Sequence, residues 1–234
     1  MFSEFEAILK KSDPGPAIEP KLEEVIESKC WIVKNLLTTN ESRAFIEAGR
    51  RSLDFSYIAN GYRHCYRAKF DDPELLSWLW ERVVPLIPNS FPHKQEYEDS
   101  SDNDEDEKKQ SIIIENKIWV KAGLYQYPRF CYYDSDDQHF TIHYDYPVST
   151  SKRDRSFLTF MLYLNGPPDY EGGNTNFFGE DSEITYSLQP ESGLAIFFLQ
   201  GADNKLPHEG APVTSGVKYI FRTEVMYKLI DKPE

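Results

Sequence analysis

The second half of the chain is a succession of short apolar segments separated by turns, and this pattern constrains the fold more than any other sequence feature. Turn-forming sequences such as Asn165-Gly166-Pro167-Pro168 and Glu171-Gly172-Gly173-Asn174 stand between the segments. Many short strands at this spacing are typical of a β-sandwich or jelly roll. We therefore expect strands at 112–114, 117–120, 123–127, 129–133, 140–146, 156–164, 175–178, 184–188, 193–199 and 216–227.

The part before residue 111 is expected to supply helices and one strand. Apolar residues at helical spacing predict helices at 1–11 and 19–28, with Pro20 in the first turn of the second. Residues 31–37 are a strand candidate, and residues 52–70 are expected to be irregular. The chain is thus predicted to be mostly β with packed helices, an α+β fold.

Two helix starts carry a specific signal. Thr38 and Glu41 have the spacing of a capping box, which predicts a helix through residues 42–48. Asp72 can cap a second helix over residues 72–84, which has a proline at its first helical position. The apolar face of this helix is expected to pack on a sheet.

The formal net charge of the 234-residue chain is −13. Residues 96–109 hold eight carboxylates and two lysines, so this one segment contributes −6. Such a run cannot bury enough apolar area to offset chain entropy, which predicts a disordered surface insertion at 95–110. The remainder is still acidic, and this argues against nucleic acid as the main partner.

Cysteine spacing and the N-terminal sequence bear on the compartment. Cys30, Cys65 and Cys131 are widely separated and form no CxxC pair, so a disulfide framework is not expected. The first residues lack the basic region and apolar run of a signal peptide. The longest apolar runs are far too short to span a bilayer. These features predict a cytoplasmic or nuclear protein with no membrane partner.

Three side chains suggest a metal site. Side chains at i and i+2 of a β-strand share a face, so His143 and Asp145 would project together from one strand. His208, from another strand, could complete the set. Two imidazoles and one carboxylate suit non-haem Fe(II), with open positions for O₂ and a co-substrate. Each histidine alone is explained as well by an ordinary hydrogen-bonded role.

The last predicted strand carries two cations on one face, Lys218 and Arg222. A long cation in a largely apolar sheet needs an anion, or else it reaches toward the edge. A dicarboxylic co-substrate would supply that anion. The alternative is an internal salt bridge, for example to Glu224 or Asp145. Four strand residues span about 13 Å, so the two cations are not expected to hold one small carboxylate together.

The motifs of the second half are specific when they are taken together. In order along the chain they are Arg129-Phe130 leading to Tyr133, His143-Tyr144-Asp145, Arg155 to Thr159 running into Tyr163-Leu164-Asn165, Glu171 to Thr175, His208 to Val213, and Gly216-Val217-Lys218. In this order they resemble the Fe(II)- and 2-oxoglutarate-dependent dioxygenases, especially the prolyl 4-hydroxylase-like branch. The resemblance covers roughly residues 30–229 and implies a double-stranded β-helix core of jelly-roll or cupin-like type, with N-terminal helices on one sheet.

The resemblance also implies roles for individual residues. His143, Asp145 and His208 would be the iron ligands, and no further catalytic side chain is expected. Lys218, ten positions after His208, would bind the far carboxylate of 2-oxoglutarate. Arg222 is the alternative, because an arginine fork suits a carboxylate better than a lysine does. The other residues expected at the co-substrate are Tyr133, Tyr163 and Thr159.

The domain plan implied by the resemblance is simple. A helical extension at 1–29 precedes one dioxygenase domain at 30–229, which the acidic insertion interrupts, and a short tail follows at 230–234. The turn before His143 departs from the family, because Asp134 to Asp137 stand where relatives usually have a glycine. The conformation of that turn is therefore left open.

The implied activity is hydroxylation of a substrate C–H bond, coupled to oxidative decarboxylation of 2-oxoglutarate to succinate and CO₂. It requires Fe(II), 2-oxoglutarate and O₂, and a role for ascorbate is left open. The expected substrate is a prolyl or other peptidyl residue of a peptide or protein, or a free amino acid. The alternatives are a nucleic-acid or small-molecule demethylase on the same fold, and a non-catalytic binding module that retains the fold.

Overall fold

One long strand, β15 (His208–Ile230), connects the two sheets of the molecule. The computed structural model describes Phe5, Gly15 and residues 19–88, 111–114, 117–134 and 138–231. The first part of β15 pairs with strands of the smaller sheet, and the part from Val217 onward pairs with strands of the larger one. Gly216 lies at the change, with φ +73°, where an added Cβ would collide with the backbone of Asp169.

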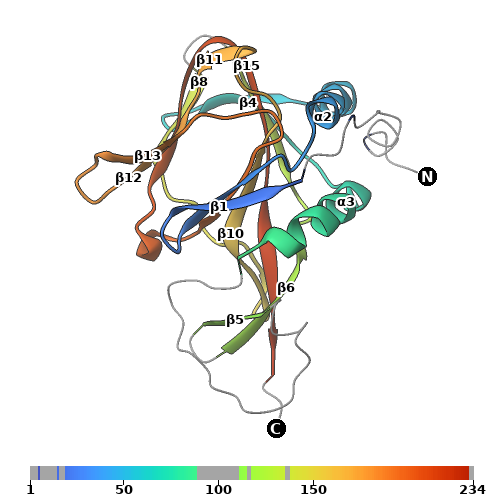
Figure 1. Ribbon diagram of the computed structural model, residues 1–234, viewed down its shortest axis with the longest axis vertical. Helices are drawn as coiled ribbons and strands as arrows, with labels where there is room; N and C mark the ends of the chain where they lie inside the picture. Colours follow the sequence, from blue (N-terminus) through green and yellow to red (C-terminus); the bar gives the residue numbers. More distant parts are fainter. Residues whose placement is uncertain are drawn as a thin grey trace.

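The larger sheet has the strand order β1-β2-β14-β10-β15-β7-β4-β3, and β5, β6 and β9 extend it. Figure 1 shows β5 and β6 at the lower end of the molecule. Its central pairs are antiparallel, with β15 between β10 and β7. The strands are β1 (Lys21–Ile26), β2 (Cys30–Lys34), β3 (Ser56–Ala59), β4 (His64–Lys69), β5 (Ser111–Ile114), β6 (Lys117–Leu124), β7 (Arg129–Asp134), β9 (Ser149–Ser151), β10 (Asp154–Tyr163) and β14 (Ala195–Leu199).

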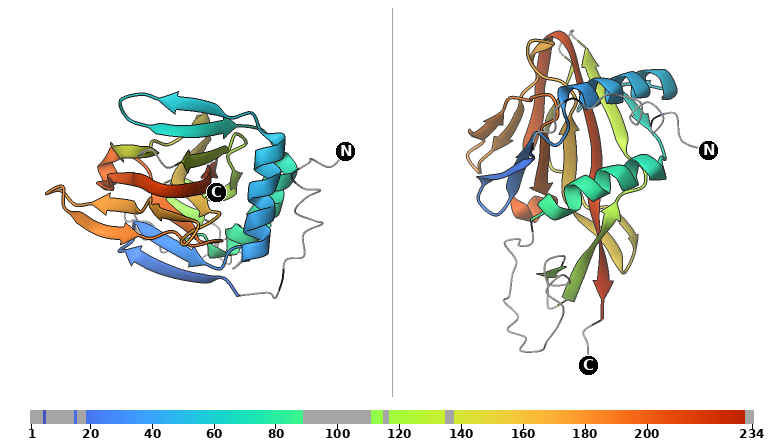
Figure 2. Two further views of the ribbon diagram at one scale, coloured as in Figure 1. Left: turned by 90° about the horizontal axis from the view of Figure 1, so that it is seen from above. Right: turned by 45° about the vertical axis from the view of Figure 1, so that its right-hand side comes forward.

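The smaller sheet consists of β8, β11, β12 and β13 together with the first part of β15. Its own strands are β8 (Gln138–His143), β11 (Tyr170–Gly172), β12 (Thr175–Phe178) and β13 (Ile184–Leu188). Figure 2 shows this sheet on the side of the larger sheet that faces away from the helices. Two facing sheets that share a strand form the predicted double-stranded β-helix, and the comparisons reported below confirm this fold class.

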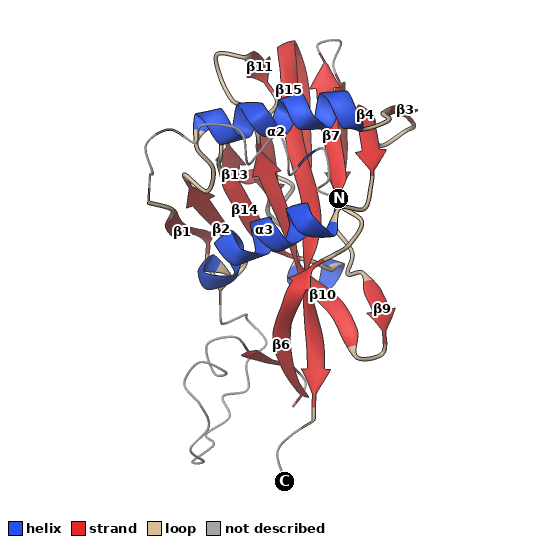
Figure 3. Ribbon diagram, turned by 90° about the vertical axis from the view of Figure 1, so that its right-hand side faces the viewer, coloured by secondary structure: helices blue, strands red, loops and turns tan. Residues whose placement is uncertain are grey.

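Two helices cover the outer face of the larger sheet, α2 (Thr39–Ser52) and α3 (Pro73–Val83), as Figure 3 shows. Both predicted caps are confirmed. Thr38 and Glu41 form a reciprocal capping box, and Asp72 accepts a hydrogen bond from the Leu75 amide at 3.0 Å. Short 3₁₀ turns follow at Val84–Leu86 and Ala202–Asn204. None of the described helices is both long and apolar enough to cross a membrane.

The period-two alternation of the strands separates two apolar cores. On β10, Phe160 and Leu162 face the helices and join the larger core. Met161 and Tyr163 face the smaller sheet and join the core between the two sheets. The functional side chains described below are carried on this second face, because it lines the space enclosed by the sheets.

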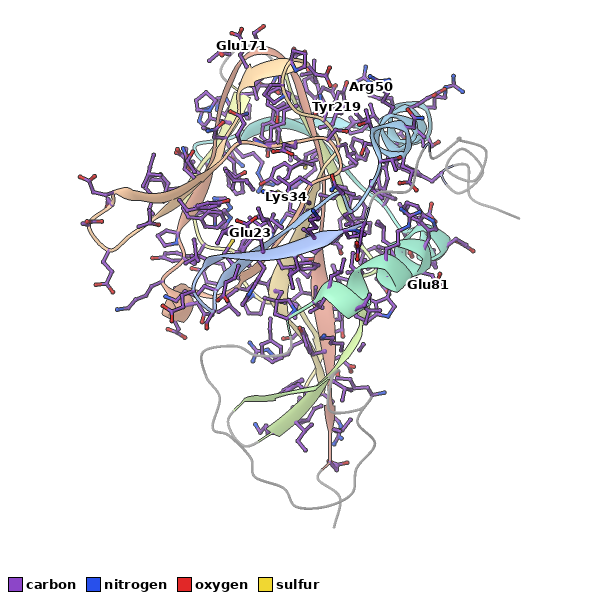
Figure 4. All side chains as sticks on the ribbon, in the orientation of Figure 1. Glu23, Lys34, Arg50, Glu81, Glu171 and Tyr219 are labelled. Atoms are coloured by element: carbon purple, nitrogen blue, oxygen red, sulfur yellow. The ribbon has the colours of Figure 1, made fainter. Side chains whose placement is uncertain are left out.

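The prediction of a helix at 19–28 is wrong. Residues Lys21–Ile26 form β1, an edge strand paired antiparallel with β2. Helix propensity is a weak preference, and the open edge of β2 supplies hydrogen-bond partners to an extended chain. Glu23 and Lys34 form an ion pair of 3.2 Å across this edge (Figure 4). The residues of 1–18 other than Phe5 and Gly15 lie outside the described part of the chain.

The prediction that residues 52–70 are irregular is also wrong. They contain the antiparallel hairpin of β3 and β4, and β4 pairs with β7. The tyrosines and arginines of this segment lack clear apolar alternation, but cross-strand contacts hold it in the sheet. Tyr66 stacks on Tyr132 of β7, with ring centroids 4.6 Å apart. The predicted acidic insertion at 95–110 and the turn residues 135–137 lie outside the described residues.

Candidate metal centre

His143, Asp145 and His208 are brought together at one end of the space between the sheets. His143 is the last residue of β8 and His208 is the first residue of β15, and the two are paired across the ladder. Asp145 lies in the loop after β8 rather than in the strand, so the predicted shared strand face is replaced by a strand end and a loop. One ligand atom from each residue lies within 4.8 Å of the others.

A β-bulge orients His143. In the ladder between β8 and β15, His143 pairs with His208 and Phe140 pairs with Gly210. Three residue steps along β8 therefore stand opposite two along β15. The extra residue places Phe140 and His143 on one face, where their ring centroids lie 3.4 Å apart. The imidazole of His143 is thereby held against an aromatic ring with its edge toward Asp145.

Each histidine presents the same ring nitrogen to the carboxylate. Nε2 of His143 lies 3.5 Å from Oδ1 of Asp145, and Nε2 of His208 lies 3.8 Å from Oδ2. Nδ1 of each ring faces a backbone carbonyl, that of Thr141 at 2.7 Å and that of Leu206 at 3.3 Å. With the Nδ1 proton donated to these carbonyls, both Nε2 lone pairs are free for a metal.

The protonation of the site suits a divalent cation. Burial lowers the pKa of His208 to about 4, so the imidazole is neutral near pH 7. Burial alone would raise the pKa of Asp145, but Arg222 and the two histidines outweigh it and hold that pKa well below its ordinary range. Two imidazoles and one carboxylate are the donor set expected for non-haem Fe(II), so the residues fit the metal.

One oxygen of Asp145 is occupied by the protein. Oδ2 accepts a hydrogen bond from Oγ1 of Thr159 at 2.8 Å and forms an ion pair with Nη2 of Arg222, also at 2.8 Å. These contacts fix the carboxylate and leave Oδ1 directed toward His143. Thr159, predicted at the co-substrate, therefore contacts a predicted metal ligand.

A cavity extends from the three ligands to Lys218. Its walls include Met161, Phe198 and Ile220 along with the ligands themselves. Nζ of Lys218 donates a hydrogen bond to the carbonyl of Gly173 at 2.6 Å, and no carboxylate of the described residues forms an ion pair with it. Burial lowers the pKa of Lys218 to about 7. A buried lysine without a counter-ion is poised to receive an anion.

Two predicted tyrosines flank this lysine. Nζ of Lys218 lies 5.7 Å from the ring centroid of Tyr133 and 5.4 Å from that of Tyr163. The hydroxyl of Tyr163 is hydrogen-bonded to Oγ1 of Thr175 at 2.7 Å. Thr175, which lines the cavity, was not predicted as a site residue, although it belongs to the glycine-rich motif that carries the family resemblance.

Arg222 occupies a different place from Lys218. It forms ion pairs with Asp145 at 2.8 Å and with Glu224 at 3.6 Å, the two partners that the salt-bridge alternative named. Glu224 is also paired with Arg129 at 2.6 Å. The charge of Arg222 is therefore already paired with carboxylates of the protein, while that of Lys218 is not paired with any carboxylate of the described residues.

The sequence model of the 2OG-Fe(II) oxygenase superfamily, where 2OG denotes 2-oxoglutarate, matches residues 128–223. This stretch contains all three candidate ligands and Lys218. This stretch of the chain is therefore similar to the 2OG-Fe(II) oxygenase superfamily. An oxygenase of this superfamily uses Fe(II), 2-oxoglutarate and O₂.

Solved structures share the fold of this chain. A prolyl-4-hydroxylase from Pseudomonas putida is 15% identical, with a TM-score of 0.54 over 88% of this chain and 95% of that one. A Trichoplax adhaerens prolyl hydroxylase in complex with a hypoxia inducible factor peptide fragment is 15% identical, with a TM-score of 0.54 over 87% and 84%. A 2OG-Fe(II) oxygenase family protein from Burkholderia pseudomallei is 12% identical, with a TM-score of 0.55 over 86% of each chain. The comparison with curated proteins finds no match.

Proposed function

We propose that this protein is an oxygenase that hydroxylates a residue of a peptide or protein substrate, with Fe(II) held by His143, Asp145 and His208. The observation that carries the proposal is the pairing of two features in one cavity. Three metal-ligand atoms within 4.8 Å of one another lie in its wall. The same cavity contains Lys218, a buried cation without a carboxylate partner among the described residues.

The two ends of the cavity suit the two ends of 2-oxoglutarate. The far carboxylate would pair with Lys218, and the keto-acid end would lie at the metal. Lys218 is preferred over Arg222 for this role, because Arg222 already pairs with Asp145 and Glu224. Tyr133, Tyr163 and Thr175 would surround the co-substrate, since they line the lysine end of the cavity or contact residues that do.

The residues of the chain have distinct tasks in this proposal. Fe(II), 2-oxoglutarate and O₂ together supply the oxidising chemistry that converts a substrate C–H bond to an alcohol. Asp145 stays ionised and is held in place by Arg222 and Thr159. The apolar walls formed by Met161, Phe198 and Ile220 keep bulk water away from the reacting atoms.

A peptidyl substrate is supported by the proteins that share the fold. One is described as a collagen prolyl hydroxylase of Paramecium Bursaria Chlorella virus-1 in complex with 2-oxoglutarate, 16% identical with a TM-score of 0.50 over 86% of this chain and 97% of that one. Another is bound to a peptide fragment. Both names concern those proteins, and we extend the substrate class to this chain as a proposal, with a prolyl residue as the first target.

The test is a coupled assay on the full chain. The protein is incubated with Fe(II), 2-oxoglutarate and proline-containing peptides, and both succinate release and a mass increase of one oxygen atom in the peptide are measured. We expect stoichiometric succinate and hydroxylated peptide. Succinate without any oxygenated peptide, across prolyl and non-prolyl peptides, would refute the substrate class while leaving the oxygenase chemistry in place.

A further inference from the structure

A second cavity adjoins the metal centre on its outer side and is rich in arginine. It has a volume of about 450 Å³, and His143 and Asp145 form part of its wall. Four arginines line it, Arg63, Arg67, Arg129 and Arg222, against two carboxylates, those of Asp145 and Glu224. The concentration of positive charge is notable in a chain whose formal net charge is −13.

The four arginines fall into two pairs. Arg129 and Arg222 are neutralised, because they form ion pairs with Glu224 and Asp145. Arg63 and Arg67 form no ion pair with any residue that the structure describes, and Nε of Arg63 is buried without a hydrogen-bond partner. Burial and the neighbouring charge of Arg63 lower the pKa of Arg67. Two half-buried guanidinium groups with uncompensated charge favour an incoming anion.

Arg63 is fixed close to the metal centre. Its Cζ lies 3.6 Å from the ring centroid of Phe140. The ring centroids of Phe140 and His143 lie 3.4 Å apart. The guanidinium and the imidazole are therefore no more than about 7 Å apart, the length of about two residues of extended chain. Arg63 is also joined to Phe140 by a backbone bridge, so the hairpin of β3 and β4 holds it in this place.

The rim of the cavity favours an extended ligand. Tyr62 and Tyr146 line the cavity and remain 69% and 67% exposed. Exposed tyrosines beside arginines are typical of surfaces that bind peptides and proteins. A free amino acid would fill only a small part of this open volume and would leave both rings in water.

We propose that the outer cavity binds an acidic segment of a peptide substrate, in which separate carboxylates pair with Arg63 and with Arg67, while a residue up to three positions from the one at Arg63 enters the metal centre. This inference rests on the proposed function, because it concerns the substrate of the same site. The ion pairs provide the preference, and Tyr62 and Tyr146 contact the flanking chain.

The inference is tested with two synthetic peptide libraries built around proline. In the first, Asp or Glu occupies positions one to three on either side of the proline, and in the second Asn or Gln replaces them. Phosphoserine peptides and free amino acids form two further arms. Oxygenated product is measured by mass and succinate by coupled assay. We expect the acidic library to be hydroxylated with a kcat/KM about ten- to a hundredfold above that of the amide library.

Variants link the preference to the two arginines. Arg63→Gln and Arg67→Gln are expected to remove most of the acidic preference through a higher peptide KM. Arg67→Glu should shift the preference toward a third library that carries lysine at the same positions, a gain that a misfolded protein cannot show. Arg43→Gln, an exposed arginine on α2 with the same loss of charge, serves as the control and should keep the wild-type preference.

The outcomes separate the two proposals. Equal hydroxylation of the acidic and amide libraries, an unchanged preference in the arginine variants, or hydroxylation confined to free amino acids or to phosphoserine peptides would overturn the acidic-segment inference. Succinate formation without oxygenated peptide would overturn both this inference and the peptidyl substrate. Absence of any iron-dependent succinate would overturn the proposed function itself.

Discussion

Nη2 of Arg222 lies 2.8 Å from Oδ2 of Asp145, so a strand residue of β15 fixes the carboxylate of the candidate metal centre. Thr159 donates to the same oxygen from the neighbouring strand β10. The other carboxylate oxygen is left for the metal. Outer contacts of this kind set the orientation of a ligand and commonly change metal affinity by about 10- to 100-fold when they are lost.

Loss of this contact should weaken iron binding. In Arg222→Gln we expect the dissociation constant for Fe(II) to rise about 10- to 100-fold, because the carboxylate loses its positively charged partner. Arg222→Lys should recover part of the affinity. The dissociation constant for Fe(II) is measured anaerobically. Arg82→Gln is the matched control, since this change removes a similar ion pair, that with Glu41, far from the candidate metal centre. Equal iron affinity in Arg222→Gln and wild type would contradict the anchoring role.

The three ligand candidates should be individually required. His143→Ala, Asp145→Ala and His208→Ala are expected to lose both bound Fe(II) and iron-dependent succinate formation, because each removes one donor from a three-donor set. Metal content is measured by mass spectrometry alongside turnover. His64→Ala is the control, because His64 stacks on His139 and belongs to no group of candidate metal ligands in the described part of the chain. Full turnover in any of these variants would contradict the assignment of that residue as an iron ligand.

Binding of 2-oxoglutarate should draw a proton onto Lys218. The pKa of the buried lysine is lowered to about 7, so near pH 8.5 it is mostly neutral, whereas pairing with a carboxylate favours the charged form. Calorimetry in buffers of different ionisation enthalpy should show proton uptake approaching about one per site at pH 8.5 and little at pH 6. Lys218→Arg, always charged, should bind without uptake, and Lys218→Met should bind far more weakly. Equal uptake at both pH values would exclude Lys218 as the titrating group.

The same lysine should limit the stability of the protein without co-substrate. In the folded protein the pKa of Lys218 is about 7, below the ordinary value of 10.5. Between pH 7 and pH 10.5 this lysine is therefore mostly protonated in the unfolded chain and mostly neutral in the folded one. The stability contribution of Lys218 is therefore lowest below pH 7 and rises toward pH 10.5. We expect Lys218→Met to unfold at a higher temperature than wild type at pH 6, with the difference shrinking toward pH 10. A difference that does not vary with pH would contradict this.

The capping box of α2 should contribute measurably to folding. Thr38 accepts from the Glu41 amide at 3.1 Å, and Glu41 accepts from the Thr38 amide at 2.8 Å and also pairs with Arg82. Thr38→Ala is expected to lower the free energy of unfolding by about 1 kcal/mol, measured by chemical denaturation. Thr38→Ser keeps the hydroxyl and should lose much less. Similar losses in both variants would point to the methyl group instead of the cap.

The local sequence determined the helix starts and the strands of the second half, because their signals lie in residues close together in the chain. The caps at Thr38 and Asp72 are contacts between residues three apart, and such contacts form whatever the rest of the chain does. The strands of the second half follow from alternation and turns. The candidate metal ligands were predicted from an order of motifs that resembles a known family, because the spacing of two histidines and an aspartate alone is ambiguous. The structure brings these three residues together.

Tertiary structure decided what depends on neighbours distant in the chain. Residues 21–26 have helical spacing, yet they are a strand because the edge of β2 offers them partners. Lys218 and Arg222 share a strand face, and the sequence alone does not distinguish them. In the fold, Arg222 forms an ion pair with Asp145, whereas Lys218 forms none with any carboxylate of the described residues. The uncompensated charge of Arg63 and Arg67 likewise emerges when the β3–β4 hairpin packs beside β8. Charge pairing depends on distances through space, and a linear sequence does not contain them.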